Sequence, residues 1–176
     1  TDSLTEGFHY YSLIVDGLTV ADPASESFYG MGRMASGIEV PFSGDGYYAV
    51  KDVPHGEIAI KRYFSTVFNT WRQFYIYKPA GYDLDSDRRY PVLYILHGGG
   101  EDERGWAIQG KADLILDNLI AADMAKPMLI VMHDGNAGGP MGFGEMALAM
   151  FERELTQCII PFVEKNYRAE TTPGNR

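Results

Sequence analysis

Two short apolar runs, at residues 91–96 and 127–132, constrain the fold of this chain more than any other feature of its sequence. Each run begins at a proline and is followed by a glycine-rich segment. A continuous apolar run of this length is typical of a β-strand that is buried on both faces. Two such strands separated by a helix predict a parallel sheet with helices on its faces, which is an α/β fold.

Two helices are expected around these strands. Residues 111–125 have an amphipathic pattern, and residues 144–167 predict a second helix that bends or restarts near Pro161. The apolar face of the first helix holds Leu114, Ile115, Leu119 and Ile120. Cys158 falls on the apolar stripe of the second helix and is expected to be a buried thiol. Three acids of this helix, Glu145, Glu152 and Glu154, are expected on its solvated face and in its first turn.

The first part of the chain has a strand and turn pattern. An aromatic and β-branched run at residues 8–15 is followed by Asp16-Gly17 and a second run at 18–20, which predicts a β-hairpin. Residues 31–54 are glycine-punctuated and are interpreted as a linker. Beyond it, residues 57–68 and 72–78 predict an antiparallel hairpin.

Charge and cysteine content exclude several classes of protein. The formal net charge is −9 and the isoelectric point is near 4.8, which argues against nucleic acid or an anionic membrane as partner. The longest apolar runs are far shorter than the ~20 residues of a membrane span. Cys158 is the single cysteine, so neither an internal disulfide nor a cysteine zinc site is possible. No metal or other cofactor is expected.

Both buried strands run into glycine-rich loops, at residues 97–106 and 133–142. In an open α/β sheet, ligands bind beyond the carboxyl ends of the strands, so these loops outline a candidate site. Nucleotide binding does not fit, because Trp106 stands where a Walker loop needs lysine and Glu103 stands where a dinucleotide fingerprint needs glycine. The segment His-Gly-Gly-Gly at 97–100 instead matches the oxyanion loop of esterases and lipases.

Ester hydrolysis passes through a tetrahedral oxyanion, and backbone N–H groups must point at it from an unobstructed turn. Glycine permits a positive φ and adds no side chain there. The amide of Gly99, followed by that of Gly100, is therefore the candidate oxyanion donor. His97 is expected to brace the loop rather than to act as a base. Trp106 and Asn136 lie on the two loops and are candidate substrate contacts, although a packed Trp and a turn Asn are equally simple interpretations.

Several segments, taken together and in order, resemble the feruloyl-esterase and esterase-D group of carbohydrate esterases (family 1). They are residues 90–100, 105–106, 117–121, 126–132 and 160–168. The resemblance covers about residues 55–176. It implies the N-terminal half of an α/β-hydrolase sheet and a serine acyl-enzyme mechanism. It also implies feruloyl or acetyl esters of plant cell-wall xylan as substrates, and a secreted or periplasmic location.

Residues 11–17, followed by Asp22-Pro23, resemble the last strands of family-48-type carbohydrate-binding modules. The resemblance implies that residues 1–30 are the end of a β-sandwich module, 31–54 a linker and 55–176 an incomplete esterase domain. Phe8, Tyr10 and Tyr11 are interpreted as sandwich core, and the expected partner is plant cell-wall polysaccharide or its feruloylated fragments.

The expected nucleophile is missing from this sequence. No serine has glycine at both flanking positions of Gly-x-Ser-x-Gly. His133 and Asp134 are adjacent and cannot form the relay geometry of a triad by themselves. The chain is therefore expected to be a window cut from a longer polypeptide, with the triad elsewhere. Two alternatives stay open: a catalytically inactive carbohydrate-binding or scaffold protein, and an acyltransferase on the same fold.

Overall fold

The computed structural model describes residues 4–44, 46–136, 145–172 and 174. In chain order the strands are β1 (Gly7–Tyr11), β2 (Leu13–Val15), β3 (Leu18–Val20), β4 (Ser27–Gly30), β5 (Arg33–Val40), β6 (Glu57–Ser65), β7 (Thr70–Lys78), β8 (Val92–Leu96) and β9 (Leu129–His133). The helices are α1 (Gly105–Ile108), α2 (Ala112–Ala121), α3 (Glu145–Glu154) and α4 (Ile160–Asn166), with a 3-10 turn η1 (Tyr82–Leu84) and a π-helical turn η2 (Leu155–Ile159).

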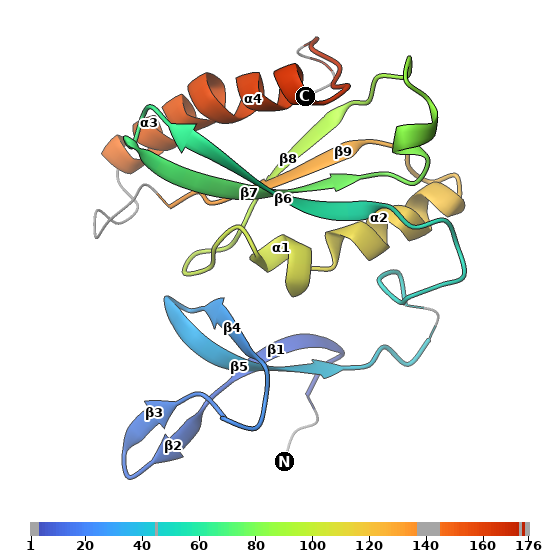
Figure 1. Cartoon of the computed structure of the whole chain (residues 1–176). Coiled ribbons are helices and arrows are strands. Elements are labelled where there is room, and N and C mark those ends of the chain that lie inside the picture. Colours follow the sequence, from blue (N-terminus) through green and yellow to red (C-terminus); the bar gives the residue numbers. More distant parts are fainter. Residues whose placement is uncertain (1–3, 45, 137–144, 173, 175–176) are drawn as a thin grey trace.

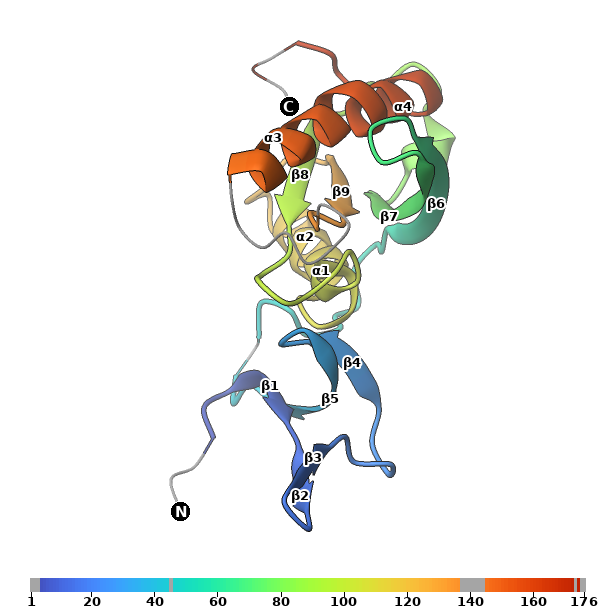
Figure 2. The ribbon, with the colours of Figure 1, turned by 90° about the vertical axis from the view of Figure 1, so that its left-hand side faces the viewer.

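The elements form four successive layers (Figure 1, Figure 2). The N-terminal strands make the first layer, and α1 and α2 separate them from the sheet of β6 to β9. Helices α3 and α4 cover the opposite face of that sheet. Helices therefore lie on both faces of the sheet, as the sequence predicts for an α/β fold.

The N-terminal part contains a three-stranded antiparallel sheet in the order β1-β5-β4 and a separate hairpin of β2 and β3. The Asp16-Gly17 hairpin prediction is confirmed, and both residues have positive φ, at 50° and 83°. A type I′ turn requires this conformation. The run at residues 8–15 is not one strand, because it divides into β1 and β2.

The interpretation of residues 31–54 as linker is wrong over residues 33–40, which form β5 at the centre of the N-terminal sheet. The glycines that suggested a linker have structural roles. Met31 and Gly32 have φ of 57° and 73° and close the hairpin between β4 and β5. At Gly37 a Cβ would lie 2.5 Å from the ring of Phe8, so only glycine admits this aromatic side chain.

The central sheet has the order β6-β7-β9-β8. The predicted hairpin is confirmed, with Glu57 paired to Lys78 and Ser65 to Thr70. The strands β8 and β9 pair in parallel, while β7 pairs antiparallel to β9, so the sheet is mixed and only its β8–β9 pair is parallel. The carboxyl ends of β8 and β9 therefore lie at the same edge of the sheet.

The expectation that residues 91–96 are buried on both faces is wrong for β8. Leu93 and Leu96 are 43% and 44% exposed, whereas all five residues of β9 are buried. The reason is position: β9 has a neighbour on each side, and β8 is the edge strand of the described sheet.

Each face of the sheet has its own hydrophobic core. On one face Phe74, Ile76 and Val131 pack with Cys158 and Val163 of the C-terminal helical segment. On the other face, Tyr77, Ile130 and Met132 pack with Ala112 and Leu116 of α2. The buried thiol predicted for Cys158 is confirmed.

The helix predicted at 144–167 is interrupted, and residue 144 lies outside the described residues. The π-helical turn η2 connects α3 to α4, and Pro161 lies in the first turn of α4. Proline fits there because the first N–H groups of a helix need no intrahelical acceptor. In the described part of the chain, no helix is long and apolar enough to cross a membrane.

Candidate active site

Two loops leave the carboxyl ends of β8 and β9 side by side. The first contains residues 97–104, and residues 133–136 begin the second; the rest of the second predicted loop, up to 142, lies outside the described residues. The parallel register pairs Leu96 with His133, so the loops start at the same level of the sheet. The arrangement agrees with the rule that places ligands at this edge.

His97 joins the two loops. In the neutral ring, Nδ1–H donates to the carbonyl of Gly98 at 2.8 Å, and Nε2 accepts from the amide of Gly135 at 3.0 Å. Nε2 also lies 3.3 Å from Oδ1 of Asp134. Burial of the ring lowers the pKa of His97, but the Asp134 carboxylate and the Gly98 carbonyl favour the protonated ring; they outweigh burial and raise the pKa above its ordinary value. All of its contacts hold loops together.

Asp134 and Asn136 are held by Arg72, a β7 residue that the sequence analysis did not single out. One Arg72 Nη atom donates to the carbonyls of Asp134 and Asn136, at 2.7 and 3.1 Å, and lies 3.1 Å from the Asp134 carboxylate. Burial alone raises the pKa of Asp134, but the contact with His97, the hydrogen bond from the Asn136 amide and the Arg72 charge lower it below its ordinary value. Asp134 is therefore an anion that stiffens the second loop.

The glycines of the first loop form a tight turn. The amide of Glu101 donates to the carbonyl of Gly98 at 3.1 Å, and the amide of Gly98 donates to the Glu101 carboxylate at 3.2 Å. Gly100 has φ of 81°, a conformation that favours glycine. Among the described residues, the amides of Gly99 and Gly100 have no hydrogen-bond acceptor. Two consecutive N–H groups at the turn thus remain available for a ligand.

The N-terminal sheet is hydrogen-bonded to this glycine turn through Gly32 and Tyr10. The carbonyl of Gly100 accepts a 2.8 Å hydrogen bond from the amide of Gly32, and a Cβ on Gly100 would lie only 2.8 Å from that nitrogen. Tyr10 donates to Glu101 at 2.9 Å and accepts from Gln109 at 2.9 Å. Burial and the bond to Glu101 raise the pKa of Tyr10 to about 12, so the phenol keeps its proton. Tyr10 was interpreted as sandwich core, and its hydroxyl in fact reaches the candidate site.

Trp106 and Asn136 occupy different settings. The indole N–H of Trp106 donates to the Leu96 carbonyl at 2.6 Å, which fixes the ring, and the side chain is 40% exposed. The side-chain amide of Asn136 donates to the Glu101 carbonyl at 2.9 Å and so ties the second loop to the first. Both residues are exposed.

Glu154 is not on the solvated face of its helix, contrary to expectation. Its side chain is 1% exposed, and it accepts short hydrogen bonds from Tyr63 (2.5 Å) and Ser65 (2.6 Å). Its carboxylate also lies 3.8 Å from Nε of Arg72. Glu154 therefore supports Arg72 beneath the second loop. A single acid within an amphipathic helix gives no sequence signal of this contact, because its partners come from β6 and β7.

His133 is the last residue of β9 and is 1% exposed. Its ring stacks on Phe151, with centroids 5.5 Å apart, and neither ring nitrogen has a hydrogen-bond partner among the described residues. Burial, reinforced by the positive charges of His97 and Arg72, lowers the pKa of His133 to about 4. The imidazole is therefore neutral near pH 7.

The N–H groups of the glycine turn can polarise a carbonyl by hydrogen bonding to its oxygen. The described residues contain no cluster of three or more His, Cys, Asp or Glu that suits a metal ion. The sequence has no Gly-x-Ser-x-Gly segment. The fold and the paired loops define an α/β domain of hydrolase type with a glycine turn suited to an oxyanion.

Comparison with known proteins agrees with this class. Residues 65–175 match the Esterase family model, described as "Putative esterase", and the chain belongs to this family. An endo-1,4-β-xylanase/feruloyl esterase of Xylanibacter ruminicola is 39% identical over 97% of this chain and 24% of its own length. Endo-1,4-β-xylanase Y of Acetivibrio thermocellus is 28% identical over 91% of this chain and 14% of its own length.

Solved structures show the same fold. A ferulic acid esterase of Anaeromyces mucronatus, in complex with ferulic acid, is 29% identical and has a TM-score of 0.66 over 75% of this chain and 51% of that chain. The feruloyl esterase module of Clostridium thermocellum, a mutant with sinapinate, is 25% identical with a TM-score of 0.60 over 95% of this chain and 48% of that one. The chain thus spans about a quarter or less of the curated relatives and about half of these structures.

Proposed function

We propose that this chain supplies the oxyanion-binding half of a serine esterase that hydrolyses feruloyl (hydroxycinnamoyl) or acetyl esters of plant cell-wall xylan. The observation that carries the proposal is the pair of free amides at Gly99 and Gly100, in a glycine turn that is anchored on three sides. Gly32 holds its carbonyl, Glu101 closes it, and His97 connects it to the neighbouring loop.

The proposed reaction uses these amides as the oxyanion donors. A serine hydroxyl adds to the ester carbonyl while a histidine takes its proton, and the carbonyl oxygen becomes an oxyanion. The amides of Gly99 and Gly100 donate to that oxygen. Collapse of the tetrahedral intermediate releases the sugar alcohol with the proton from the histidine, and water then hydrolyses the acyl-enzyme. One lost donor of this kind costs roughly 10²–10³ in rate.

The sequence has no Gly-x-Ser-x-Gly segment that would supply the serine of this mechanism. His97 is an unsuitable base, since its ring nitrogens are engaged by Gly98, Gly135 and Asp134. His133 is buried. The edge of β8 is unpaired within the described sheet and lies beside the glycine turn, so a strand added there would bring its following loop to the site.

The acyl group is proposed to be aromatic. Trp106 presents a partly exposed ring, held by its N–H, beside the glycine turn, and an arene can stack on such a ring. The matched structures with ferulic acid and sinapinate support the same class of acid. Asn136 is proposed as a second substrate contact, although its amide already serves the loops. The N-terminal strands are proposed as the end of a carbohydrate-binding module, and the protein as secreted or periplasmic.

Hydrolysis of methyl ferulate by the protein that carries this domain, followed by chromatography of the released ferulate, tests the proposal. We expect ferulate release and a covalent adduct, one feruloyl group heavier, in the mass spectrum of rapidly quenched protein. Absence of both, with retained binding to xylan fragments, supports the inactive scaffold instead, which the missing Gly-x-Ser-x-Gly favours. Transfer of the feruloyl group to an added sugar alcohol in preference to water supports an acyltransferase.

A further inference from the structure

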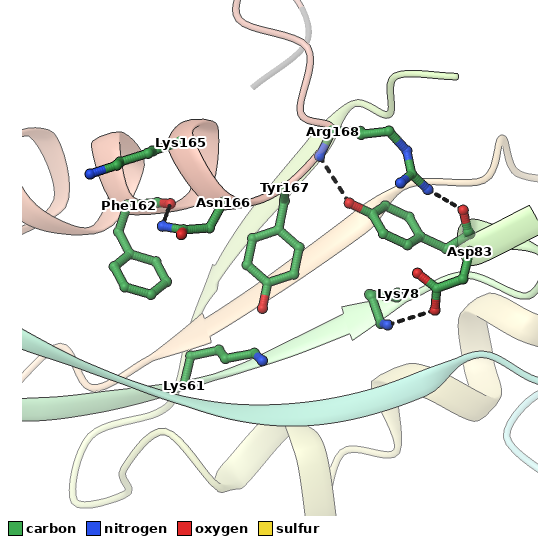
Figure 3. A pocket seen from close by; sticks show the side chains of 9 residues that line it. Lys61, Lys78, Asp83, Phe162, Lys165, Asn166, Tyr167 and Arg168 are labelled. Atoms are coloured by element: carbon green, nitrogen blue, oxygen red, sulfur yellow. Dashed lines mark hydrogen bonds and ion pairs between the residues drawn. The ribbon is translucent and has the colours of Figure 1, made fainter. Parts of the chain in front are cut away.

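An open cleft of 580 Å³ lies on the face of the sheet that carries α4, at the side of β6 (Figure 3). Its lining comes from β6, β7, the turn η1 and the end of α4. The strand register places the cleft far from the glycine turn. Lys78 follows Tyr77, which pairs with Ile130 near the start of β9. The glycine turn follows β8, whose last residue pairs with the last residue of β9 at the opposite edge of the sheet. The cleft is therefore separate from the candidate active site.

The cleft is cationic in an acidic protein. Lys61, Lys78, Lys165 and Arg168 line it together with a single carboxylate, Asp83. The formal charge of the whole chain is −9, so the positive charge of four cations around one cavity contrasts with the negative charge of the chain. Such a local concentration of positive charge attracts an anionic ligand.

Two of the four cations are already engaged. Lys78 pairs with Asp83 at 2.9 Å and with Glu57 at 3.1 Å. Arg168 lies over the Tyr82 ring, 3.9 Å from its centroid, and donates to the carbonyls of Tyr82 and Arg88. These contacts form a fixed wall at one end of the cleft.

The other two cations, Lys61 and Lys165, have no hydrogen-bond or ion-pair partner among the described residues. They come from different elements, β6 and α4, on the two sides of the cleft. Figure 3 shows the Tyr167 ring pointing from the end of α4 toward Lys61. Burial raises the pKa of Tyr167 to about 12, so its hydroxyl remains a neutral hydrogen-bond donor beside Lys61, whereas the Lys165 side chain extends along α4 away from Tyr167.

We propose that this cleft is an accessory binding site for a xylan segment that carries a uronic acid, with Lys61 binding the carboxylate, Lys165 adding positive charge at the other side of the cleft and the ring of Tyr167 contacting the sugar. The inference rests on the proposed function, because it takes the same polysaccharide as ligand. A cavity of 580 Å³ with an aromatic wall and lysines on two sides suits a carboxylated oligosaccharide better than a small ion. The side-chain amide of Asn166 leaves its carbonyl oxygen available for a sugar hydroxyl, since its nitrogen donates to Phe162 at 2.7 Å.

The test is calorimetric titration of the protein with a xylotriose that carries one glucuronic acid, beside neutral xylotetraose and inorganic phosphate. We expect the acidic probe to bind about tenfold more tightly than xylotetraose. We expect its affinity to fall as NaCl rises from about 0.05 to about 0.3 M. The double variant Lys61→Ala/Lys165→Ala removes the preference for the acidic probe, while Lys126→Ala, an exposed lysine outside the cleft, leaves it unchanged.

Three results overturn the inference: equal binding of the neutral and acidic probes, unchanged affinity of the double variant with a native circular dichroism spectrum, or phosphate binding as tight as that of the acidic probe. The readout is binding at a site remote from the ester chemistry. A protein that binds the acidic probe and fails to release ferulate therefore overturns the proposed activity alone, and the reverse pattern overturns the cleft alone.

Discussion

The hydroxyl of Tyr10 donates a 2.9 Å hydrogen bond to the carboxylate of Glu101, which connects strand β1 to the glycine turn after β8. The two residues are 91 positions apart in sequence. Together with the Gly32–Gly100 backbone hydrogen bond, this contact makes the N-terminal sheet part of the support of the candidate oxyanion hole. The N-terminal strands thus help to position the glycine turn.

Tyr10→Phe is expected to loosen the glycine turn, because it removes the phenol that holds Glu101. A hydrogen bond of this kind contributes ~1 kcal/mol, so exchange of the amides of Gly98 and Glu101 with deuterium should become about fivefold faster. Tyr47→Phe is the matched control, since the Tyr47 side chain is 58% exposed and lies outside the site. Equal exchange in the two variants contradicts a supporting role for Tyr10.

Glu154→Gln is expected to lower the free energy of unfolding by about 1–3 kcal/mol, because it weakens two short buried hydrogen bonds and removes the charge near Arg72. Urea denaturation measures this change. Glu152→Gln, an exposed residue of the same helix, should change the free energy by less than about 0.5 kcal/mol. If both variants lose the same stability, the buried network does not stabilise the fold.

His133 makes the protein sensitive to acid. Its pKa falls from 6.5 to about 4 on folding, so the unfolded chain binds a proton that the folded chain excludes. The contribution of neutral His133 to the free energy of unfolding is therefore fully present above pH 6.5. It declines as pH falls and is lost once pH passes about 4. The difference between the two pKa values corresponds to about 3 kcal/mol of the free energy of unfolding.

His133→Phe keeps a ring against Phe151 and removes the titration, so its free energy of unfolding should depend less on pH over this interval. The measurement is urea denaturation at several pH values. His9→Phe, at a histidine that hydrogen bonds only to the Thr5 carbonyl, serves as the control. An identical pH dependence in wild type and His133→Phe contradicts the assignment.

The sequence predicted those elements whose signal is local. The Asp16-Gly17 turn, the β6–β7 hairpin and the strand β9 each follow from residues adjacent in the chain. Strand β5 was missed because its glycines suggested a linker, although Gly37 lies against the rings of Phe8 and Phe28, where a Cβ would clash. Exposure of β8 was also missed, since it depends on which strands are neighbours and not on the apolar run itself.

For the site, the sequence could identify the two loops and their glycines, because a motif marks them. It could not reveal the residues that hold the loops in place. Arg72, Glu154 and Tyr10 reach their partners across the fold, and Glu154 contacts Ser65 and Tyr63 at separations of 89 and 91 residues. Contacts of this length follow from the packing of α3 on the sheet, which no local pattern encodes.

The most direct test of the central claim compares methyl ferulate hydrolysis by wild type, Gly100→Ala and Gly81→Ala in the protein that carries this domain. Both glycines have positive φ, at 81° and 78°, so both variants strain the backbone, but only at Gly100 would a Cβ press on the backbone of Gly32 and displace the turn. We expect ferulate release by wild type, activity in Gly81→Ala within about twofold of wild type, and a loss of activity of roughly 10²–10³ in Gly100→Ala. No ferulate release by wild type, or full activity in Gly100→Ala, contradicts an oxyanion-binding role of the glycine turn.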